Sequence, residues 1–405
     1  MAALLAAVVV LGAAIRLIDL SAPISRSPDE ATYTMQANAL AKDGFTGSRA
    51  VVQEYFKSPE EQLNPPPTRI GFYSLVALSM KISGIHDERA GAYVACWASI
   101  LALAAGIWTG WRFWGFGPAL FGGLFLALFP PDLVIARRCW SDALVGLVGI
   151  LMMYLTMEIF SGRERWFFYI PLVLVGSAAA LVKETSILIY APCLAITLWA
   201  LARKRDYRAA GLVLGMAAAC TLLAIGLLAI FTGNIRFPVT MVLTGAHTNT
   251  FNTYALNFQS GPGYLLLWGF GALSPITAIL AVIGVAVGVV NSRDRSRSGI
   301  VLLSCLTVTL LIIFMLVPLW LNLRYVSASY APICLFAGSA LWWMLTTVNR
   351  KLPFAGTGLS TLALALVALS MFADHQRFEK AFVRITANDL SVGVIRDALK
   401  LSSQQ

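Results

Sequence analysis

The sequence predicts an all-α polytopic membrane protein with about eleven transmembrane helices. Of its 405 residues, 58% are hydrophobic and only 12% are charged, which is about half the charged share of a typical soluble domain. Long apolar segments recur along the whole chain, and basic residues collect between alternate segments. A soluble fold of this size has too small an interior for so much apolar surface. A bilayer accommodates it if helices satisfy the backbone hydrogen bonds.

The predicted spans have roughly the 20-residue length that crosses a bilayer as a helix. The first span has no basic residues before it and no cleavage site after it, so it is interpreted as an uncleaved span rather than a signal peptide. The segment 166–202 is alternatively one broken hairpin. The spans lie near 2–20, 89–110, 116–131, 141–160, 166–182, 186–202, 209–231, 263–290, 299–320, 326–347 and 354–373.

The distribution of Lys and Arg predicts the orientation. With a cytoplasmic N-terminus, the inner loops are strongly basic, as the positive-inside rule requires. The formal net charge of +10 is then explained by topology, and no basic stripe with stacking aromatic residues remains to indicate a nucleic-acid partner. The compact loops favour a bacterial inner membrane. The inner basic residues are Arg112, Arg163, Arg165, Arg203, Lys204, Arg205, Arg208, Arg293, Arg295, Arg297, Arg350 and Lys351.

The cysteines indicate neither a disulfide framework nor a metal site. Five of the six lie inside predicted spans, where they behave as small apolar residues. Only Cys139 lies near the outer surface, and no spacing typical of metal ligands is present.

Polar residues collect on the predicted outer side. A transmembrane module over 1–373 carries two long outer loops, 21–88 and 232–262, and is followed by an outer tail over 374–405. Ionisable groups at a membrane boundary are costly and usually mark a site, although single Lys and Arg residues at helix ends also snorkel to the interface. Such groups recur here at the ends of several spans: Asp132, Arg137, Arg138, Asp142, Lys183, Glu184 and Arg324.

The first outer loop predicts two helices. Ser27, Pro28 and Glu30 have the form of a helix start with a capping box, and Gly44 is a suitable stop, so a helix is expected over 28–43. Asp29 and Glu30 lie in its first turn, where the helix dipole alone favours one acid. After three prolines, a second helix is expected over 68–83, interfacial or re-entrant and ending at Gly84.

The second outer loop, 232–262, alternates amides with aromatic residues around His247. This pattern suits carbohydrate contact and equally suits an ordinary surface loop. No partner ligand accompanies His247, so it does not predict a metal site.

An ordered set of short motifs resembles a known family over about residues 1–350. In this order and spacing, the chain resembles the GT-C membrane glycosyltransferases, most closely the protein O-mannosyltransferases and the lipid A aminoarabinose transferases. The motifs are Pro28-Asp29-Glu30 with Tyr33 after the first span, Pro65-Pro66-Pro67 with Tyr73, Arg89 opening the next span, Ala136-Arg137-Arg138-Cys139-Trp140-Ser141-Asp142, Leu181-Val182-Lys183-Glu184, and Arg324-Tyr325 with Pro332.

The resemblance implies a GT-C-like bundle that transfers a hexosyl or pentosyl group from a polyprenyl-phosphate donor. The acceptor is expected to be a hydroxyl on a protein, a lipid or a glycan, on the extracytoplasmic face. It assigns catalytic roles to Asp29, as the base, with Glu30 and Asp142. It assigns substrate contacts to Tyr33 and Tyr73, to which the polar loop adds His247. Contact with the donor phosphate is implied for Arg89, Arg137, Arg138, Lys183, Arg324 and Tyr325.

Two features depart from the family pattern. Family members often have Lys-Gly where this chain has Lys183-Glu184, which adds a negative charge near the expected phosphate. Many relatives also continue into a sizeable extracytoplasmic domain, whereas about thirty residues follow the last predicted span here.

The residue types suit this chemistry. A carboxylate within hydrogen-bond reach accepts the proton of the attacking hydroxyl, and Arg and Lys hold the leaving phosphate. A single inverting displacement is therefore expected. The sequence indicates no cofactor, although a divalent cation is compatible with the chemistry, and the expected partners are the lipid-linked donor, the acceptor and membrane lipids.

Three other functions remain open from sequence. One is a transporter or a flippase for lipid-linked sugars, although no internal repeat is visible. Another is a non-catalytic scaffold, which leaves the outer acids and bases unexplained. The third is an oligosaccharide ligase that uses a lipid-pyrophosphate donor.

Overall fold

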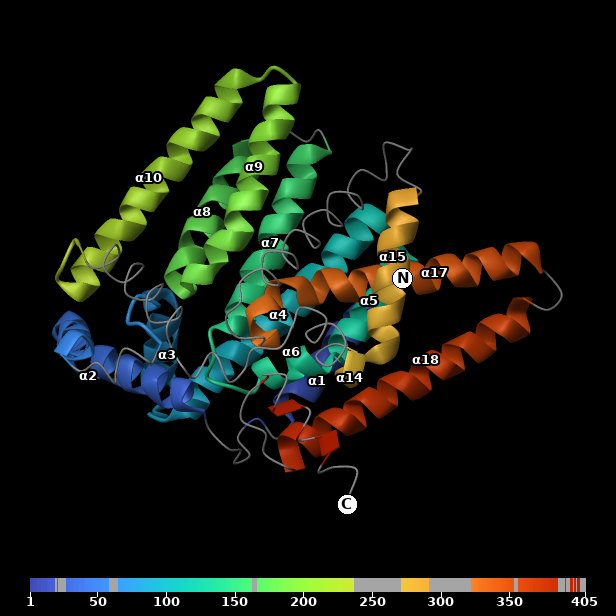
Figure 1. Ribbon diagram of the computed structural model, residues 1–405, viewed down its shortest axis with the longest axis horizontal. Helices are drawn as coiled ribbons and strands as arrows, with labels where there is room; N and C mark the ends of the chain where they lie inside the picture. The colour runs from blue at the N-terminus through green and yellow to red at the C-terminus, as the bar shows by residue number, and fades with distance from the viewer. Residues whose placement is uncertain are drawn as a thin grey trace.

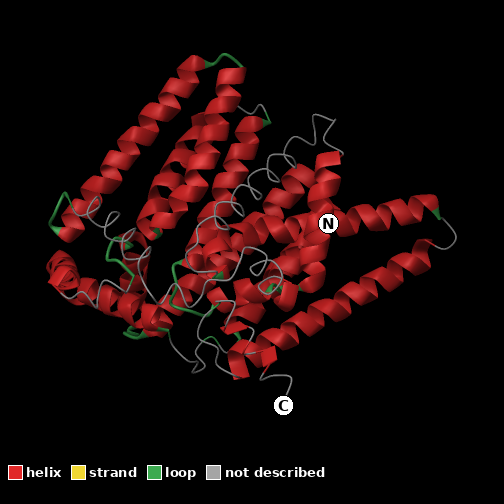
Figure 2. Ribbon diagram, viewed as in Figure 1, coloured by secondary structure: helices red, strands yellow, loops and turns green. Residues whose placement is uncertain are grey.

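The part of the protein that the computed structural model describes is mostly helical. The described residues are 1–18, 20, 27–57, 65–161, 166–236, 271–290, 322–352, 356–384, 390, 394–395, 397 and 399–400. No strand occurs within these ranges (Figure 2), and the predicted all-α class is confirmed. The long helices are α1 (Ala2–Leu17), α2 (Pro28–Lys57), α3 (Ile70–Ser83), α4 (Glu88–Trp114), α5 (Phe116–Ala127), α7 (Asp142–Phe160), α8 (Trp166–Val182), α9 (Ile187–Arg203), α10 (Tyr207–Thr232), α15 (Pro275–Val290), α17 (Tyr330–Lys351) and α18 (Gly356–Phe378). Short elements are α6 (Pro130–Ile135), η2 (Glu184–Ser186), α14 (Gly271–Leu273), η5 (Leu323–Ser329) and η6 (Glu379–Arg384).

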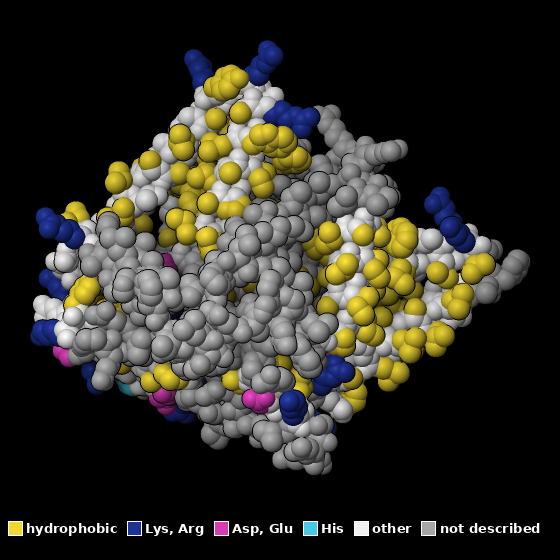
Figure 3. Space-filling model, in the orientation of Figure 1, with side chains coloured by type: hydrophobic (Ala, Val, Ile, Leu, Met, Phe, Trp, Pro, Cys, Tyr) yellow, Lys and Arg dark blue, Asp and Glu magenta, His cyan; other side chains and the backbone are white. Residues whose placement is uncertain are grey.

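Described helices overlap every predicted span except 299–320, which lies outside the described residues. Six of the helices in the described ranges are long and apolar enough to cross a bilayer. Two of these, α10 and α18, expose rows of large apolar side chains such as Leu222 and Leu369. Figure 3 shows this apolar surface along the long helices, with Lys and Arg at their tips. The protein is therefore built to be surrounded by lipid.

Helices α7, α8, α9 and α10 run up and down beside one another (Figure 1). The start of α7, the end of α8 and the start of α9 consequently lie at one end of this group. Helices α2 and α3 lie against the same end, where α2 contacts α10 and α3 contacts α8. Residues that are distant in sequence meet there.

Helix α2 differs from its prediction in length. The expected stop at Gly44 exists as a break, since Gly44 has φ +59° and ψ −139°, a conformation that an L-residue rarely adopts. The helix nevertheless resumes and continues to Lys57, because its second half has its own partners. Phe45 packs edge-on against Phe231 with ring centroids 4.9 Å apart, and Arg49 donates to the Ile230 carbonyl at 3.1 Å.

Helix α3 matches its prediction closely. It ends at Gly84, which has φ +70° and caps the helix in the left-handed conformation. Its first turn lies directly on the backbone at the end of α8: a Cβ added to Gly71 would lie 3.1 Å from the carbonyl oxygen of Leu181. The start of α3 is therefore fixed relative to the turn that follows α8.

Candidate active site

The start of α2 is held by the expected capping interaction. The Ser27 amide donates to Glu30 Oε2 at 2.8 Å, and Pro28 occupies the first helical position. The Ser27 hydroxyl accepts a hydrogen bond from Trp140 Nε1 at 3.0 Å. This fixes the first turn of α2 against the segment before α7.

Glu30 is buried and connects α2 to the segment before α7. Its side chain is fully buried and lies 3.0 Å from Arg138 Nη1, and its Oε1 accepts the Cys139 amide at 3.0 Å. A carboxylate with these partners faces the protein interior. Its geometry suits joining α2 to the segment before α7 rather than contacting a substrate.

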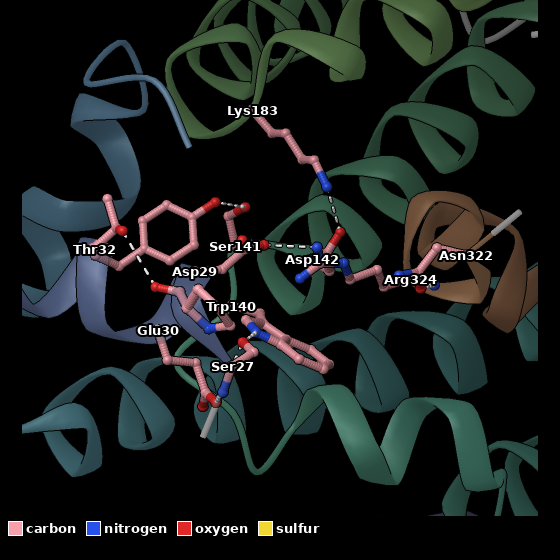
Figure 4. A network of polar contacts seen from close by, with 12 residues as sticks. Ser27, Asp29, Glu30, Thr32, Trp140, Ser141, Asp142, Lys183, Asn322 and Arg324 are labelled. Atoms are coloured by element: carbon pink, nitrogen blue, oxygen red, sulfur yellow. Dashed lines mark hydrogen bonds and ion pairs between the residues drawn. The ribbon is translucent and has the colours of Figure 1, made fainter. Parts of the chain in front are cut away.

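Asp29 points to the other side of the turn, toward Arg324 (Figure 4). Its Oδ2 lies 2.6 Å from Arg324 Nη2, and its side chain is 25% exposed. Burial raises the pKa of Asp29, but the charges of Arg324, Arg69 and Lys183 outweigh burial and leave that pKa below its usual value. Asp29 is therefore held ionised.

Arg324 is positioned by its own turn and by an aromatic ring. The Asn322 side chain accepts the Arg324 amide at 3.2 Å and caps η5. The guanidinium carbon lies 4.9 Å from the Trp140 ring centroid and 5.5 Å from that of Tyr325. Such cation–π contacts orient a planar guanidinium, and they place the predicted Arg324-Tyr325 pair beside Asp29.

A second pair joins α7 to the turn after α8. Lys183 Nζ lies 2.6 Å from Asp142 Oδ1, and both side chains are almost completely buried. The ammonium also lies 4.4 Å from the Tyr325 ring centroid. Burial lowers the pKa of Lys183 from its usual value, with the Asp142 charge opposing that shift.

A third pair involves Arg69, which sequence reasoning did not assign to the site. Arg69 binds Glu184 with two hydrogen bonds, Nη2 to Oε1 at 2.5 Å and Nε to Oε2 at 3.0 Å. It also donates from Nη1 to the Tyr33 hydroxyl, which lies 3.5 Å from Ser141 Oγ. The signal in the sequence was weak, because Arg69 is a lone basic residue at the start of an apolar helix.

These three pairs form one acid–base cluster, which we call the outer cluster. It contains three cations and three carboxylates contributed by α2, α7, η5, the start of α3 and the turn between α8 and α9: Asp29, Arg69, Asp142, Lys183, Glu184 and Arg324. Such a cluster can bind an anion through its cations and accept a proton on a carboxylate.

The structure does not bring every predicted residue to the outer cluster. Arg89 lies on the surface, 45% exposed, and pairs with Asp87 at 2.7 Å, because that acid is two residues away at the start of α4. Tyr73 is buried, 3.3 Å from the Ser48 hydroxyl, where it supports the second half of α2. His247 lies outside the described residues.

The two adjacent arginines before α7 contact groups other than the six residues of the outer cluster. Arg138 pairs with Glu30, and its guanidinium carbon lies 5.0 Å from the Trp140 ring centroid. Arg137 donates to the Ile15 carbonyl at 3.0 Å and lies against Phe378. Both therefore connect helices that surround the site.

A further buried network lies largely inside apolar segments, and the sequence indicated only its member Asp132. Arg16, in α1, pairs with Asp132 and donates to Ser99 Oγ at 2.6 Å. It also donates to the Leu126 and Ala127 carbonyls at the end of α5, both at 3.1 Å. The sequence signal for the rest of this network was Arg16 itself, since a basic residue inside a predicted span needs a buried partner.

Within the described ranges, no group of three or more His, Cys, Asp and Glu side chains is arranged to hold a metal ion. The carboxylates of the outer cluster are each paired with a cation of the chain.

Comparison with solved structures shows the fold. ArnT from Cupriavidus metallidurans, bound to undecaprenyl phosphate, is similar with a TM-score of 0.62 and 14% identity, over 98% of this chain and 75% of that one. Its apo state gives a TM-score of 0.56 with the same identity and coverage. The apo oligosaccharyltransferase from Archaeoglobus fulgidus gives 0.54 and 10% identity, over 98% of this chain and 55% of that one.

No protein-family model matches the sequence, and no curated protein matches it. The similarity to solved structures is therefore a similarity in the arrangement of helices. This arrangement is the GT-C fold, as the ordered motifs predicted.

Proposed function

We propose that this GT-C-fold protein is a glycosyltransferase that takes a sugar from a polyprenyl-phosphate donor and transfers it to a hydroxyl acceptor. The observation that carries the proposal is the outer cluster, in which an ionised carboxylate, Asp29, lies among the cations Arg69, Lys183 and Arg324. The structural neighbour ArnT, bound to undecaprenyl phosphate, supports a lipid phosphate as the ligand. Apolar helices with exposed side chains provide lipid-facing surface for a prenyl chain.

The proposed reaction is one displacement with inversion at the anomeric carbon. The acceptor oxygen attacks this carbon while the bond from the carbon to the phosphate oxygen breaks. Asp29 takes the acceptor proton, and the polyprenyl phosphate leaves with the bonding electrons. Arg324 and Lys183 stabilise the negative charge that develops on the leaving phosphate.

Asp29 and its neighbours suit different parts of this reaction. Asp29 is one-quarter exposed, so an acceptor can reach it. Asp142 is buried against Lys183 and would orient that ammonium. Arg324 offers a planar fork to two phosphate oxygens, whereas Lys183 acts as a point charge. This chemistry uses side chains of the chain and requires no cofactor, although a divalent cation is compatible with it.

The orientation of the site is part of the proposal. The inner loops predicted from sequence are basic, which supports a cytoplasmic N-terminus and an extracytoplasmic outer cluster. The compact loops support a bacterial inner membrane. The sugar, hexosyl or pentosyl, and the acceptor class are to be found by assay.

The decisive experiment is sugar transfer by purified protein with a panel of polyprenyl-phosphate sugars. Asp29→Asn is compared with Asp87→Asn, which alters a surface carboxylate that is also paired with an arginine. We expect transfer by the wild type and by Asp87→Asn, and a loss of about 10²-fold or more in Asp29→Asn. Full activity in Asp29→Asn would remove the base assignment. A folded wild type that neither binds nor uses any donor would favour a transporter or flippase.

A further inference from the structure

The Arg69–Glu184 pair has no role in the mechanism above, yet it lies within the outer cluster. The pair is bidentate, and the close contact of Gly71 with the Leu181 backbone fixes the start of α3 against the turn that carries Glu184. The charge of Arg69 also acts on Asp29 and Lys183. Arg69 is thus electrostatically part of the same site as the two cations assigned to the phosphate.

The two partners differ in exposure. The Arg69 side chain is 11% exposed, whereas that of Glu184 is 42% exposed. Glu184 therefore covers the guanidinium from the solvent side. A carboxylate presents two oxygens to the fork in the same way as a phosphate does.

Charge balance favours an exchange. Among the described residues the outer cluster has three cations for three carboxylates, so an added phosphate gains most where it replaces a carboxylate on one of the cations. Asp142 is 4% exposed, and its departure would leave Lys183 buried without its counter-ion. Glu184 is the most exposed of the three, and its departure into solvent is the least costly.

We propose that Arg69 is a further phosphate-binding residue and that Glu184 is the carboxylate that Arg69 exchanges for the lipid phosphate. This rests on the proposed function, because it deepens the account of the same site. In the unliganded protein Glu184 occupies the Arg69 fork. When the lipid-linked donor binds, its phosphate takes the fork and the Glu184 carboxylate swings into solvent.

The exchange also acts on the product. The donor phosphate is a diester with one negative charge, whereas the released polyprenyl phosphate is a monoester with a charge of about −1.5 to −2 at pH 7. The basic groups therefore retain the product more strongly than the donor. Glu184 competes for Arg69 and promotes product release.

The test is binding of undecaprenyl phosphate to the full chain in nanodiscs, by calorimetry. Arg69→Gln and Glu184→Gln are compared with the wild type. Arg49→Gln, an exposed arginine bound to the Ile230 carbonyl, and Asp87→Asn are the matched controls. We expect affinity to fall about tenfold or more in Arg69→Gln, rise severalfold in Glu184→Gln and stay unchanged in both controls. In turnover, Glu184→Gln should be inhibited by undecaprenyl phosphate at lower concentration than the wild type.

The outcomes separate this inference from the proposed function. A wild type that does not bind undecaprenyl phosphate would contradict both. A wild type that binds it, with Arg69→Gln binding equally well, would overturn only the inference. Equal weakening in Arg69→Gln and Glu184→Gln would also overturn it, since the pair would then be a structural link. If Arg69→Gln does not fold, the rise in affinity in Glu184→Gln still decides, because misfolding does not tighten binding.

Discussion

Asp29 Oδ2 and Arg324 Nη2 lie 2.6 Å apart and join the first turn of α2 to η5, two elements that are far apart in the sequence. The proposed base therefore shares its partner with the proposed phosphate site. If Arg324 turns to a phosphate, as the proposed function requires, Asp29 loses its strongest counter-ion and becomes a better proton acceptor. We therefore expect this one guanidinium to couple donor binding to activation of the base.

Replacing Arg324 with lysine tests this coupling. Arg324→Lys keeps the charge but loses the fork and the contact with the Trp140 ring. We expect the affinity for undecaprenyl phosphate to fall about tenfold or more. Calorimetry on the variant in nanodiscs measures this change. Wild-type affinity in Arg324→Lys would show that only the charge matters.

Glu30→Gln should affect stability more than it affects chemistry. Glu30 is buried, pairs with Arg138 and accepts two backbone amides. Removing its charge leaves the buried guanidinium of Arg138 without the Glu30 carboxylate, which costs about 3–5 kcal/mol. Thermal unfolding in detergent should show a clear fall in Tm for Glu30→Gln and a smaller one for Asp29→Asn. Equal Tm values would contradict the anchoring role of Glu30.

Variants of the Lys183–Asp142 pair distinguish an effect on protein stability from an effect on phosphate binding. Asp142→Asn should be strongly destabilising because Lys183 stays buried without its carboxylate. The double variant Lys183→Met/Asp142→Leu should recover most of the lost stability, since an apolar pair of similar volume is often tolerated there. It should nevertheless bind undecaprenyl phosphate more weakly. A stable double variant with wild-type affinity would remove Lys183 from the phosphate site.

The pH dependence follows from the depressed pKa of Asp29. A carboxyl whose folded-state pKa is lowered contributes stability above its unfolded pKa and loses it as pH falls through the folded value. Asp29 therefore stays ionised from about pH 5 to 8. We expect kcat/KM, which reports the free enzyme, to show no acid limb from Asp29 in this range. A limb near pH 6 that shifts in Asp29→Glu would contradict this.

Substitution of Gly91 tests the packing of α4 against the segment before α7. A Cβ at Gly91 would lie 2.0 Å from Cys139 Sγ and 3.2 Å from its Cα. Gly91→Ala should therefore displace the Cys139 segment and cost about 1–3 kcal/mol. Adding Cys139→Gly should restore part of the Tm. Gly211→Ala, where nothing lies within 4 Å, is the control, and an equal effect there would exclude a steric cause.

Local physical signals made parts of the site predictable. The capping box at Ser27 and Glu30 and the glycine stops at Gly44 and Gly84 depend on neighbouring residues alone. Ionisable residues at span ends indicated Asp142, Lys183 and Arg324 because charge at a membrane boundary is costly. Apolar segments of span length likewise predicted most of the helices.

Most of the pairing in the site was not predictable, because it depends on contacts between distant segments. Arg69 meets Glu184 across more than a hundred residues of chain, and nothing near Arg69 indicates that partner. Arg89 had the expected position but is held by Asp87, two residues before it. Arg16 lay hidden in an apolar span, where one charge hardly changes the hydrophobic pattern.

The Asp29–Arg324 contact also determines how much of the chain has to be synthesised before the outer cluster can form. A ribosome adding about 5–20 residues per second makes Asp29 tens of seconds before Arg324, because the two lie about 300 residues apart in the sequence. Until η5 emerges, the nascent chain has the carboxylate without its guanidinium partner. We expect a chain that ends before η5 to insert most of its helices without the proposed transferase activity, because it has Asp29 but not Arg324.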